Sequence, residues 1–193
     1  MSEPLVRTFL ALEIPEEIRL RVGQIQGHLK KALGGIRWVR PEGMHLTLKF
    51  FGDVSAADIA AIEKTVSMST DRMTSMTFSL GALGTFPNAT RPRVLWLGIE
   101  GDDTIRLAEL QQRVETNLEQ VGFSKEKRFF TPHLTLGRIS SPGKKMLGID
   151  TIMRDMRSPE IHSFRVDELV LFKSELKPTG ALYGKLARFS FGG

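Results

Sequence analysis

The sequence of 193 residues contains no cysteine. This absence excludes disulfide bonds, thiolate nucleophiles and cysteine-ligated metal centres. It is in keeping with a reducing cytoplasm, which is where we expect the protein to act. No apolar run is long enough to span a bilayer, and residues 1–7, with Glu3 and Pro4, do not resemble a signal peptide. We therefore expect no membrane association.

Histidine is scarce, and its placement is the most informative feature of the sequence. Two of the four histidines, His45 and His133, each begin the tetrapeptide His-Leu-Thr-Leu. Successive side chains of a β-strand point to opposite faces. If both copies are strands, each histidine shares a face with the threonine two residues later, Thr47 or Thr135. Each copy then presents an imidazole and a hydroxyl to a cleft and two leucines to a core.

Composition and charge bound the class of protein only loosely. Hydrophobic residues make up 41% of the chain and charged residues 25%, which is ordinary for a globular domain. The formal net charge is +5. An excess of this size is compatible with simple solubility and also with attraction to a polyanion such as RNA. Charge alone does not decide between these two interpretations.

The order of predicted elements repeats once along the chain. His45 and His133 are 88 residues apart (133 − 45), and so are the apolar strand openings at Val6 and Val94 (94 − 6). A repeat of this kind indicates two related lobes. We predict an α+β, bilobal fold, with two pseudo-symmetric lobes, antiparallel sheets lining a central cleft and helices outside. Residues 1–193 would form one domain, with the lobes joined near residues 87–92 and closing strands from the second half.

Hydrophobic periodicity and turn residues give the expected elements in more detail. Strands are predicted at residues 6–14, 36–39, 44–51, 76–83, 93–99, 133–139, 161–172 and 181–191. Helices are predicted after Pro15, after an N-cap at Ser55, and over residues 104–121 and 144–156.

A pair of histidines can supply a general acid and a general base together, because the reference pKa of imidazole is about 6.5. Threonine hydroxyls beside them can donate hydrogen bonds to anionic oxygens. This set suits in-line displacement at a phosphodiester. A purely structural role and a zinc site are the alternatives. Two copies at matched places favour catalysis, and zinc needs three or four ligands, whereas only Asp53 lies near in sequence. We expect no metal and no cofactor.

Three further residues are candidates for substrate binding. Arg138 follows the second tetrapeptide. A regular strand would turn it away from His133, but a bulge or bend at Gly137 could re-aim it toward a phosphate. Phe129 could stack on a base or pack in the core, and Tyr183, the only tyrosine, could line the same groove. The basic stretches at residues 125–128 and 144–145 could hold an RNA backbone or simply be solvated.

The chain resembles the 2H phosphoesterase superfamily, and more narrowly the LigT-like RNA 2′,3′-cyclic phosphodiesterases, once called 2′-5′ RNA ligases. The resemblance covers nearly the whole chain and rests on the stretches FLALEIP, WVRPEGMHLTLKFFGDV, RVLWLGI, FTPHLTLGR and VDELVLFKSELKPTGALYGKLARF. It implies a bilobal fold with the two motifs facing across a cleft. It also implies metal-independent hydrolysis of RNA 2′,3′-cyclic phosphate ends to 2′-phosphates.

The resemblance also implies a role for each site residue. His45 would be the proton donor and His133 the proton acceptor. Thr47 and Thr135 would hold the phosphate oxygens, and Arg138 would contact the phosphate. The expected partner is RNA with a 2′,3′-cyclic phosphate end, such as a tRNA fragment, bound by a monomer. Two alternatives remain at this point: 2′-5′ RNA ligation by the same residues, and a non-enzymatic RNA-binding module.

Overall fold

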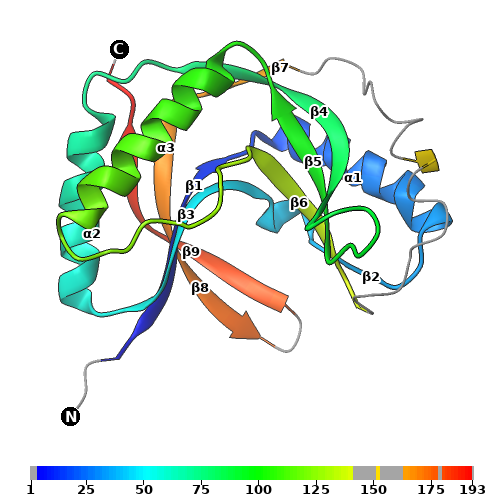
Figure 1. Ribbon diagram of the computed structural model, residues 1–193, viewed down its shortest axis with the longest axis horizontal. Helices are drawn as coiled ribbons and strands as arrows, with labels where there is room; N and C mark the ends of the chain where they lie inside the picture. The colour runs from blue at the N-terminus through cyan, green and yellow to red at the C-terminus, as the bar shows by residue number, and fades with distance from the viewer. Residues whose placement is uncertain (1–3, 141–150, 153–162, 178–179, 193) are drawn as a thin grey trace.

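Two antiparallel β-sheets form the framework of the protein (Figure 1). The computed structural model describes residues 4–140, 151–152, 163–177 and 180–192. The first sheet has the strand order β3 (His45–Val54), β1 (Val6–Glu13), β8 (Glu168–Lys177), β9 (Gly180–Ser190). The second has the order β2 (Ile36–Trp38), β6 (His133–Ile139), β5 (Val94–Glu100), β4 (Met76–Phe86), β7 (Ser163–Val166).

Helices lie outside the sheets, as predicted. Helices α2 (Ala56–Thr70) and α3 (Asp103–Glu119) lie together at one side of the molecule, and α1 (Glu16–Ala32) lies at the other (Figure 1). The predicted N-cap of α2 is confirmed: Ser55 Oγ accepts from the Asp58 amide at 3.2 Å, and the Asp58 carboxylate accepts from the Ser55 amide at 2.9 Å. This capping box satisfies two donors that a helix start leaves unpaired. A short 3₁₀ helix (Pro41–Gly43) leads into β3.

The two sequence halves exchange strands. The first sheet takes β1 and β3 from the first half but β8 and β9 from the second. The second sheet takes β5, β6 and β7 from the second half but β2 and β4 from the first. The bilobal α+β prediction is confirmed. Each lobe, however, is built from both halves, so the expected joint at residues 87–92 is wrong. That segment connects β4 to β5, which are adjacent in one sheet.

Two other predicted boundaries also change in the structure. The strand predicted at residues 161–172 is two strands that separate at Asp167, because β7 pairs with β4 in the second sheet and β8 pairs with β1 in the first. The strand carrying His45 continues to Val54, past its predicted end at residue 51. The helix predicted at residues 144–156 falls mostly outside the described residues, of which 151–152 are helical.

The apolar faces of both sheets and of the helices meet in a large core. A smaller cluster of Phe9, Ala11, Val170 and Phe172 lies on the other face of β1 and β8. All four leucines of the two tetrapeptides belong to the large core, and none is more than 3% exposed. Burying a leucine side chain stabilises the fold by about 1.5–3 kcal/mol. The leucines therefore fix the face of each strand on which the histidine and threonine lie.

Candidate active site

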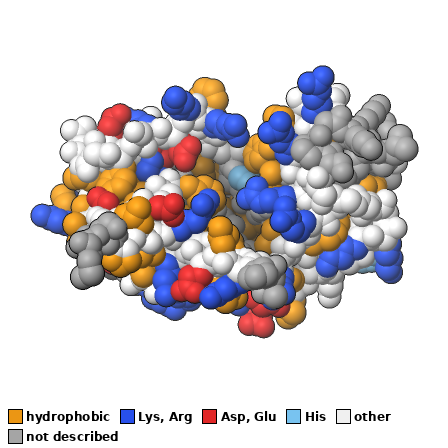
Figure 2. Space-filling view, turned by 90° about the horizontal axis from the view of Figure 1, so that it is seen from below, with side chains coloured by type: hydrophobic (Ala, Val, Ile, Leu, Met, Phe, Trp, Pro, Cys, Tyr) orange, Lys and Arg blue, Asp and Glu red, His pale blue; other side chains and the backbone are white. Residues whose placement is uncertain are grey.

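A cleft of about 450 Å³ between the two sheets brings the repeated motifs together. His45 and Thr47 line it from β3, and His133 and Thr135 line it from β6. Figure 2 shows a hollow near the middle of one face, with a histidine inside and lysine or arginine side chains at its rim. Clefts of this size commonly bind small molecules. The strand alternation expected from the sequence is present in both copies, whose burial alternates between partly buried and buried.

Both motif strands carry a β-bulge at the same place. On β1, the consecutive residues Leu10 and Ala11 pair with Lys49 and Thr47, so Leu48 is the extra residue. Likewise, the consecutive partners Leu95 and Trp96 on β5 leave Leu136 unpaired. Leu48 and Leu136 are 88 residues apart, the same offset as the histidines. A bulge shifts the side-chain alternation by one residue.

This shift explains how Arg138 reaches the cleft. Five residues past His133, Arg138 would point away in a regular strand, yet it lines the cleft with the motif residues. The re-aiming by a bulge or bend was predicted at Gly137, and the bulge lies one residue earlier, at Leu136. Gly137 is needed for a different reason, since a Cβ there would lie 2.4 Å from Ile36 Cγ2. The equivalent residue of the first motif, Phe50, also lines the cleft. Phe50 was not predicted from the sequence.

Each histidine is held by the same backbone contact. His45 Nδ1 lies 2.9 Å from the carbonyl oxygen of Gly43, and His133 Nδ1 lies 2.6 Å from that of Thr131. A carbonyl oxygen only accepts hydrogen bonds, so Nδ1 is the donor in both rings. Nε2 is then the nitrogen whose protonation state changes. Such a ring accepts a proton at Nε2 when neutral and donates it from there when charged.

Aromatic rings surround His45. Phe9 stacks on it with ring centroids 4.4 Å apart, and Tyr183 meets it edge-on at 5.2 Å. Tyr183 also lies against Gly43, where a Cβ would approach its ring to 3.3 Å. Tyr183 lines the cleft, as expected from the sequence. These contacts fix the orientation of the imidazole and exclude water from one side of it.

His133 has an aromatic environment of its own. Its ring centroid lies 5.0 Å from that of Phe86, edge-on, and 5.9 Å from that of Trp96. Phe86 comes from β4 and Trp96 from β5, and β5 lies between β4 and β6 in the second sheet. Phe9, Phe86 and Trp96 were not identified from the sequence, because an apolar strand gives no indication of which aromatic side chain will touch a distant histidine.

Burial lowers the pKa of both histidines. The pKa of His45 falls to about 4, chiefly through desolvation and slightly through the nearby His133, while the hydrogen bond to Gly43 opposes the change. Desolvation also lowers the pKa of His133, against the hydrogen bond to Thr131. Both rings are therefore neutral at pH 7. For one histidine to act as an acid, a nearby anion must raise its pKa.

The cleft is suited to such an anion. Arg7 and Arg138 line it, and among its described lining residues none is acidic. Burial raises the pKa of Tyr183, although Arg138 and Arg7 act to lower it, so its hydroxyl stays protonated and able to donate. Arg7 was not predicted from the sequence. Two guanidinium groups, two threonine hydroxyls and a phenol can together bind a phosphate group.

The structure does not bring Phe129 into the cleft. Its side chain is fully exposed, in the loop before β6, and it does not line the cleft. The neighbouring Phe130 is partly buried against the core. Of the other histidines, His28 is exposed on α1, and His162 lies outside the described residues.

Neither a metal-binding cluster nor a membrane-spanning helix is present in the part of the chain that the structure describes. In these residues no three histidine or carboxylate side chains gather in a way that could hold a metal ion. No helix among them is long and apolar enough to cross a bilayer.

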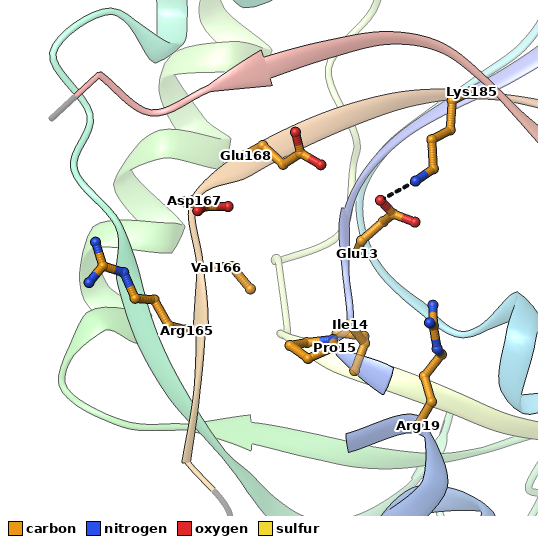
Figure 3. Close-up of a pocket in the computed structure, with 9 residues that line it drawn as sticks. All are labelled: Glu13, Ile14, Pro15, Arg19, Arg165, Val166, Asp167, Glu168 and Lys185. Atoms are coloured by element: carbon orange, nitrogen blue, oxygen red, sulfur yellow. Dashed lines mark hydrogen bonds and ion pairs between the residues drawn. The ribbon is translucent and has the colours of Figure 1, made fainter. Parts of the chain in front are cut away.

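A second cavity, of about 350 Å³, lies where the chain passes between the sheets (Figure 3). Its lining includes residues 13–15, which are the end of β1 and the turn before α1, and the link between β7 and β8. Glu13 points toward Lys185 there, with an oxygen–nitrogen distance of 2.5 Å. Acidic and basic side chains both line this cavity. Paired charges of this kind suit a junction between lobes better than a site for an anion.

The chain is similar to known proteins in both sequence and fold. The family model described as "LigT like Phosphoesterase" matches in two stretches, residues 12–96 and 98–183. An RNA 2′,3′-cyclic phosphodiesterase of Methanothermobacter thermautotrophicus is 36% identical, covering 95% of this chain and 98% of that protein. One of Thermotoga maritima is 34% identical, covering 97% of each.

Two solved structures share the fold over nearly the whole chain. A crystal structure of a Thermus thermophilus protein has a TM-score of 0.78 at 25% identity, covering 96% of this chain and 97% of that one. Escherichia coli LigT complexed with 3′-AMP has a TM-score of 0.77 at 25% identity, covering 97% of this chain and 98% of that one.

Proposed function

The chain belongs to the LigT-like phosphoesterase family, and on that premise we propose that it hydrolyses RNA 2′,3′-cyclic phosphate ends to 2′-phosphates without a metal ion. The observation that carries this proposal is the pair of His-Leu-Thr-Leu strands facing one cleft, each with its histidine held through Nδ1 to a backbone carbonyl. Matched geometry on both sides suits a reaction that needs one proton taken and one given.

The proposed reaction is an in-line displacement at phosphorus. His133 Nε2 accepts a proton from water as the water oxygen bonds to phosphorus. The bond from phosphorus to the 3′ oxygen breaks, and His45 donates its Nε2 proton to that oxygen. The product carries a 2′-phosphate and a 3′-hydroxyl. His45 ends neutral and His133 protonated, so a proton must pass back through solvent before the next turnover.

The lowered pKa of His45, about 4, supports its role as the proton donor. Once protonated, a histidine with a pKa of this size gives its proton readily to a leaving oxygen. The negative charge of the bound phosphate supplies the condition for protonating His45, because an opposite charge nearby raises the pKa of a histidine.

The remaining polar residues of the cleft would bind the phosphate. Thr47 and Thr135 each share a strand face with their histidine, which suits them to donate to the non-bridging oxygens. Arg138 would pair with the phosphate, since guanidinium binds it in a forked geometry. The 3′-AMP complex of the E. coli protein supports a nucleoside phosphate as the ligand of such a cleft.

The proposal is tested with a nucleoside 2′,3′-cyclic phosphate in the presence of EDTA, with products separated by chromatography. We expect a 2′-phosphate. A 3′-phosphate would reverse which oxygen leaves, and dependence on added metal would remove the two-histidine mechanism. His45→Ala and His133→Ala should each abolish turnover, whereas His28→Ala, on the exposed face of α1, should keep full activity.

The same assay separates hydrolysis from its rivals. Supplying two RNA fragments, one with a cyclic phosphate end and one with a 5′-hydroxyl, reports 2′-5′ ligation as a joined product. Water is present at far higher concentration than RNA, so we expect hydrolysis to dominate. RNA binding that survives loss of both histidines, with no product from the parent protein, would leave only a binding module.

A further inference from the structure

A groove of about 670 Å³, separate from the 350 Å³ cavity, lies beside the catalytic cleft. It is lined on one side by Lys49, Phe50 and Phe51 of β3, and on the other by the loop at residues 122–128, which follows α3. Phe50 lines both the groove and the catalytic cleft. The cleft and the groove therefore adjoin at one side chain, so one chain-like ligand could reach both.

The loop side of the groove is basic and solvent-exposed. Lys125 pairs with Glu119 at 2.9 Å. Lys127 and Arg128 are exposed and pair with no carboxylate in the part of the chain that the structure describes. Within residues 122–128 the only acid is Glu126. A surface with unpaired cations next to a phosphate-binding cleft attracts a second stretch of negative charge.

Two exposed aromatic rings accompany these cations. Phe129, which follows Arg128, is 101% exposed, and Phe50 is 55% exposed. Phenylalanine is usually buried, so a ring left in water beside a binding cleft needs a reason. Single-stranded nucleic acids are bound by this combination, in which cations track the backbone and aromatic rings stack on the bases.

Buried contacts connect the loop at residues 122–128 to β3. Lys49 is buried and lies 2.7 Å from Glu115 and 2.8 Å from the carbonyl oxygen of Ser124. The same Glu115 carboxylate accepts from the amide of Glu126 at 3.2 Å. Lys49 follows the bulge at Leu48 directly, so the position of the basic loop is tied to that of the first motif.

We propose that this groove binds the RNA chain on the 5′ side of the terminal cyclic phosphate, with Lys127 and Arg128 on the backbone and Phe129 on a base. This inference rests on the proposed function, because a 2′,3′-cyclic phosphate lies at the 3′ end of RNA and the rest of the chain can leave the cleft only in the 5′ direction. The groove would then make an oligonucleotide a better substrate than a mononucleotide.

The test compares two substrates across three variants. The substrates are a nucleoside 2′,3′-cyclic phosphate and a single-stranded RNA of about eight nucleotides, within the span that one such site covers, ending in the same group. The variants are Lys127→Ala/Arg128→Ala, Phe129→Ala, and the control Lys31→Ala/Lys64→Ala. The control removes the same charge from exposed positions on α1 and α2 that line neither the cleft nor the groove.

We expect kcat/KM for the oligonucleotide to fall at least about fivefold in Lys127→Ala/Arg128→Ala and in Phe129→Ala. The value for the mononucleotide should not change, and the control should match the parent on both substrates. In the Lys127→Ala/Arg128→Ala variant the slope of log(kcat/KM) against log[salt] should become shallower by about 1.4, because each phosphate contact to a single strand contributes about 0.7.

Other outcomes would overturn the inference. Equal losses on both substrates would assign these residues to the fold or the cleft, and unchanged kinetics on the oligonucleotide would leave them as solvated surface. If the parent turns over neither substrate, the proposed function fails. Fluorescence anisotropy with the same labelled RNA then still tests whether the groove binds RNA. The groove is supported there only if Lys127→Ala/Arg128→Ala weakens binding and Lys31→Ala/Lys64→Ala does not.

Discussion

The side-chain nitrogen of Gln26 lies 2.8 Å from the carbonyl oxygen of Leu136, the bulged residue of the second motif. Gln26 is fully buried in α1, and the same nitrogen donates to the carbonyl of Val39 at 2.9 Å. The first motif has a weaker counterpart, in which Gln111 of α3 lies 3.5 Å from the carbonyl of the bulged Leu48. In each lobe a helix glutamine thus supports the bulge that follows the threonine.

Replacing Gln26 by leucine should therefore destabilise the protein and lower its activity. The Leu136 carbonyl keeps only the Val39 amide as a donor, at 2.9 Å, and the Val39 carbonyl loses the Gln26 nitrogen. Leaving a buried polar group unpaired costs about 1–3 kcal/mol. Urea unfolding measures this loss. We also expect kcat/KM to fall, because Arg138 lies two residues beyond the bulge. Gln24→Leu, on the exposed face of the same helix, is the control and should change stability by less than about 0.5 kcal/mol. Equal behaviour of the two variants would contradict a supporting role for Gln26.

The buried pair Lys49–Glu115 should show strong coupling. Both side chains are at most 6% exposed and lie 2.7 Å apart. Glu115→Gln leaves the ammonium buried without its counter-charge, which costs about 3–5 kcal/mol. Lys49→Met/Glu115→Leu should cost much less stability than the sum of the losses in Lys49→Met and Glu115→Leu. A double-mutant cycle in urea measures this difference. Glu119→Gln breaks the exposed pair with Lys125 and should cost at most about 1 kcal/mol. Additive single changes at the buried pair would rule out the coupling.

The dependence of kcat/KM on pH should be bell-shaped, with an optimum below pH 6.5. The reactive form needs His45 protonated and His133 neutral. In the free enzyme the pKa of His45 is about 4 and that of His133 is lowered from 6.5, so this form is lost as pH rises past both values. The basic limb of kcat should lie at higher pH than that of kcat/KM, since bound phosphate raises the pKa of His45. A profile that is flat from roughly pH 4 to 8 would contradict an acid–base pair.

The stability of the protein should fall with decreasing pH because of His45. Its pKa of about 4 in the folded state lies below the reference value of 6.5, so the unfolded chain binds the proton more readily. The stabilisation is complete above pH 6.5 and is lost as pH falls from there toward 4. Between pH 7 and pH 5 the loss is about 2 kcal/mol. His45→Gln should show a correspondingly smaller change in the free energy of unfolding over this range. An identical pH dependence in the two proteins would show that His45 stays solvated.

The local structure of the chain could largely be predicted from its sequence. Alternation in His-Leu-Thr-Leu places the histidine and threonine on one face and the leucines in the core, and burial of all four leucines confirms it. Likewise, Ser55 with Asp58 marks the start of α2. These features depend on residues a few positions apart, so short stretches of sequence contain the information.

The long-range arrangement could not be predicted in the same way. Whether residues 87–92 separate two lobes or connect neighbouring strands depends on which strands pair, and β4 and β8 each pair within the sheet of the other half. Asp167, where the chain leaves one sheet for the other, has no local signal. The aromatic contacts of His45 and His133 likewise come from strands distant in sequence.

By itself, the sequence determined the two motif strands, the faces on which their histidines and threonines lie, and the α+β class with its repeat of 88 residues. Periodicity and local capping decide these features, and both act over a few residues. Only the tertiary structure decided the exchange of strands between lobes, the two bulges that turn Phe50 and Arg138 toward the cleft, and the burial that lowers the pKa of both histidines. Strand pairing and desolvation arise between segments far apart in the chain, and no short stretch of sequence contains them.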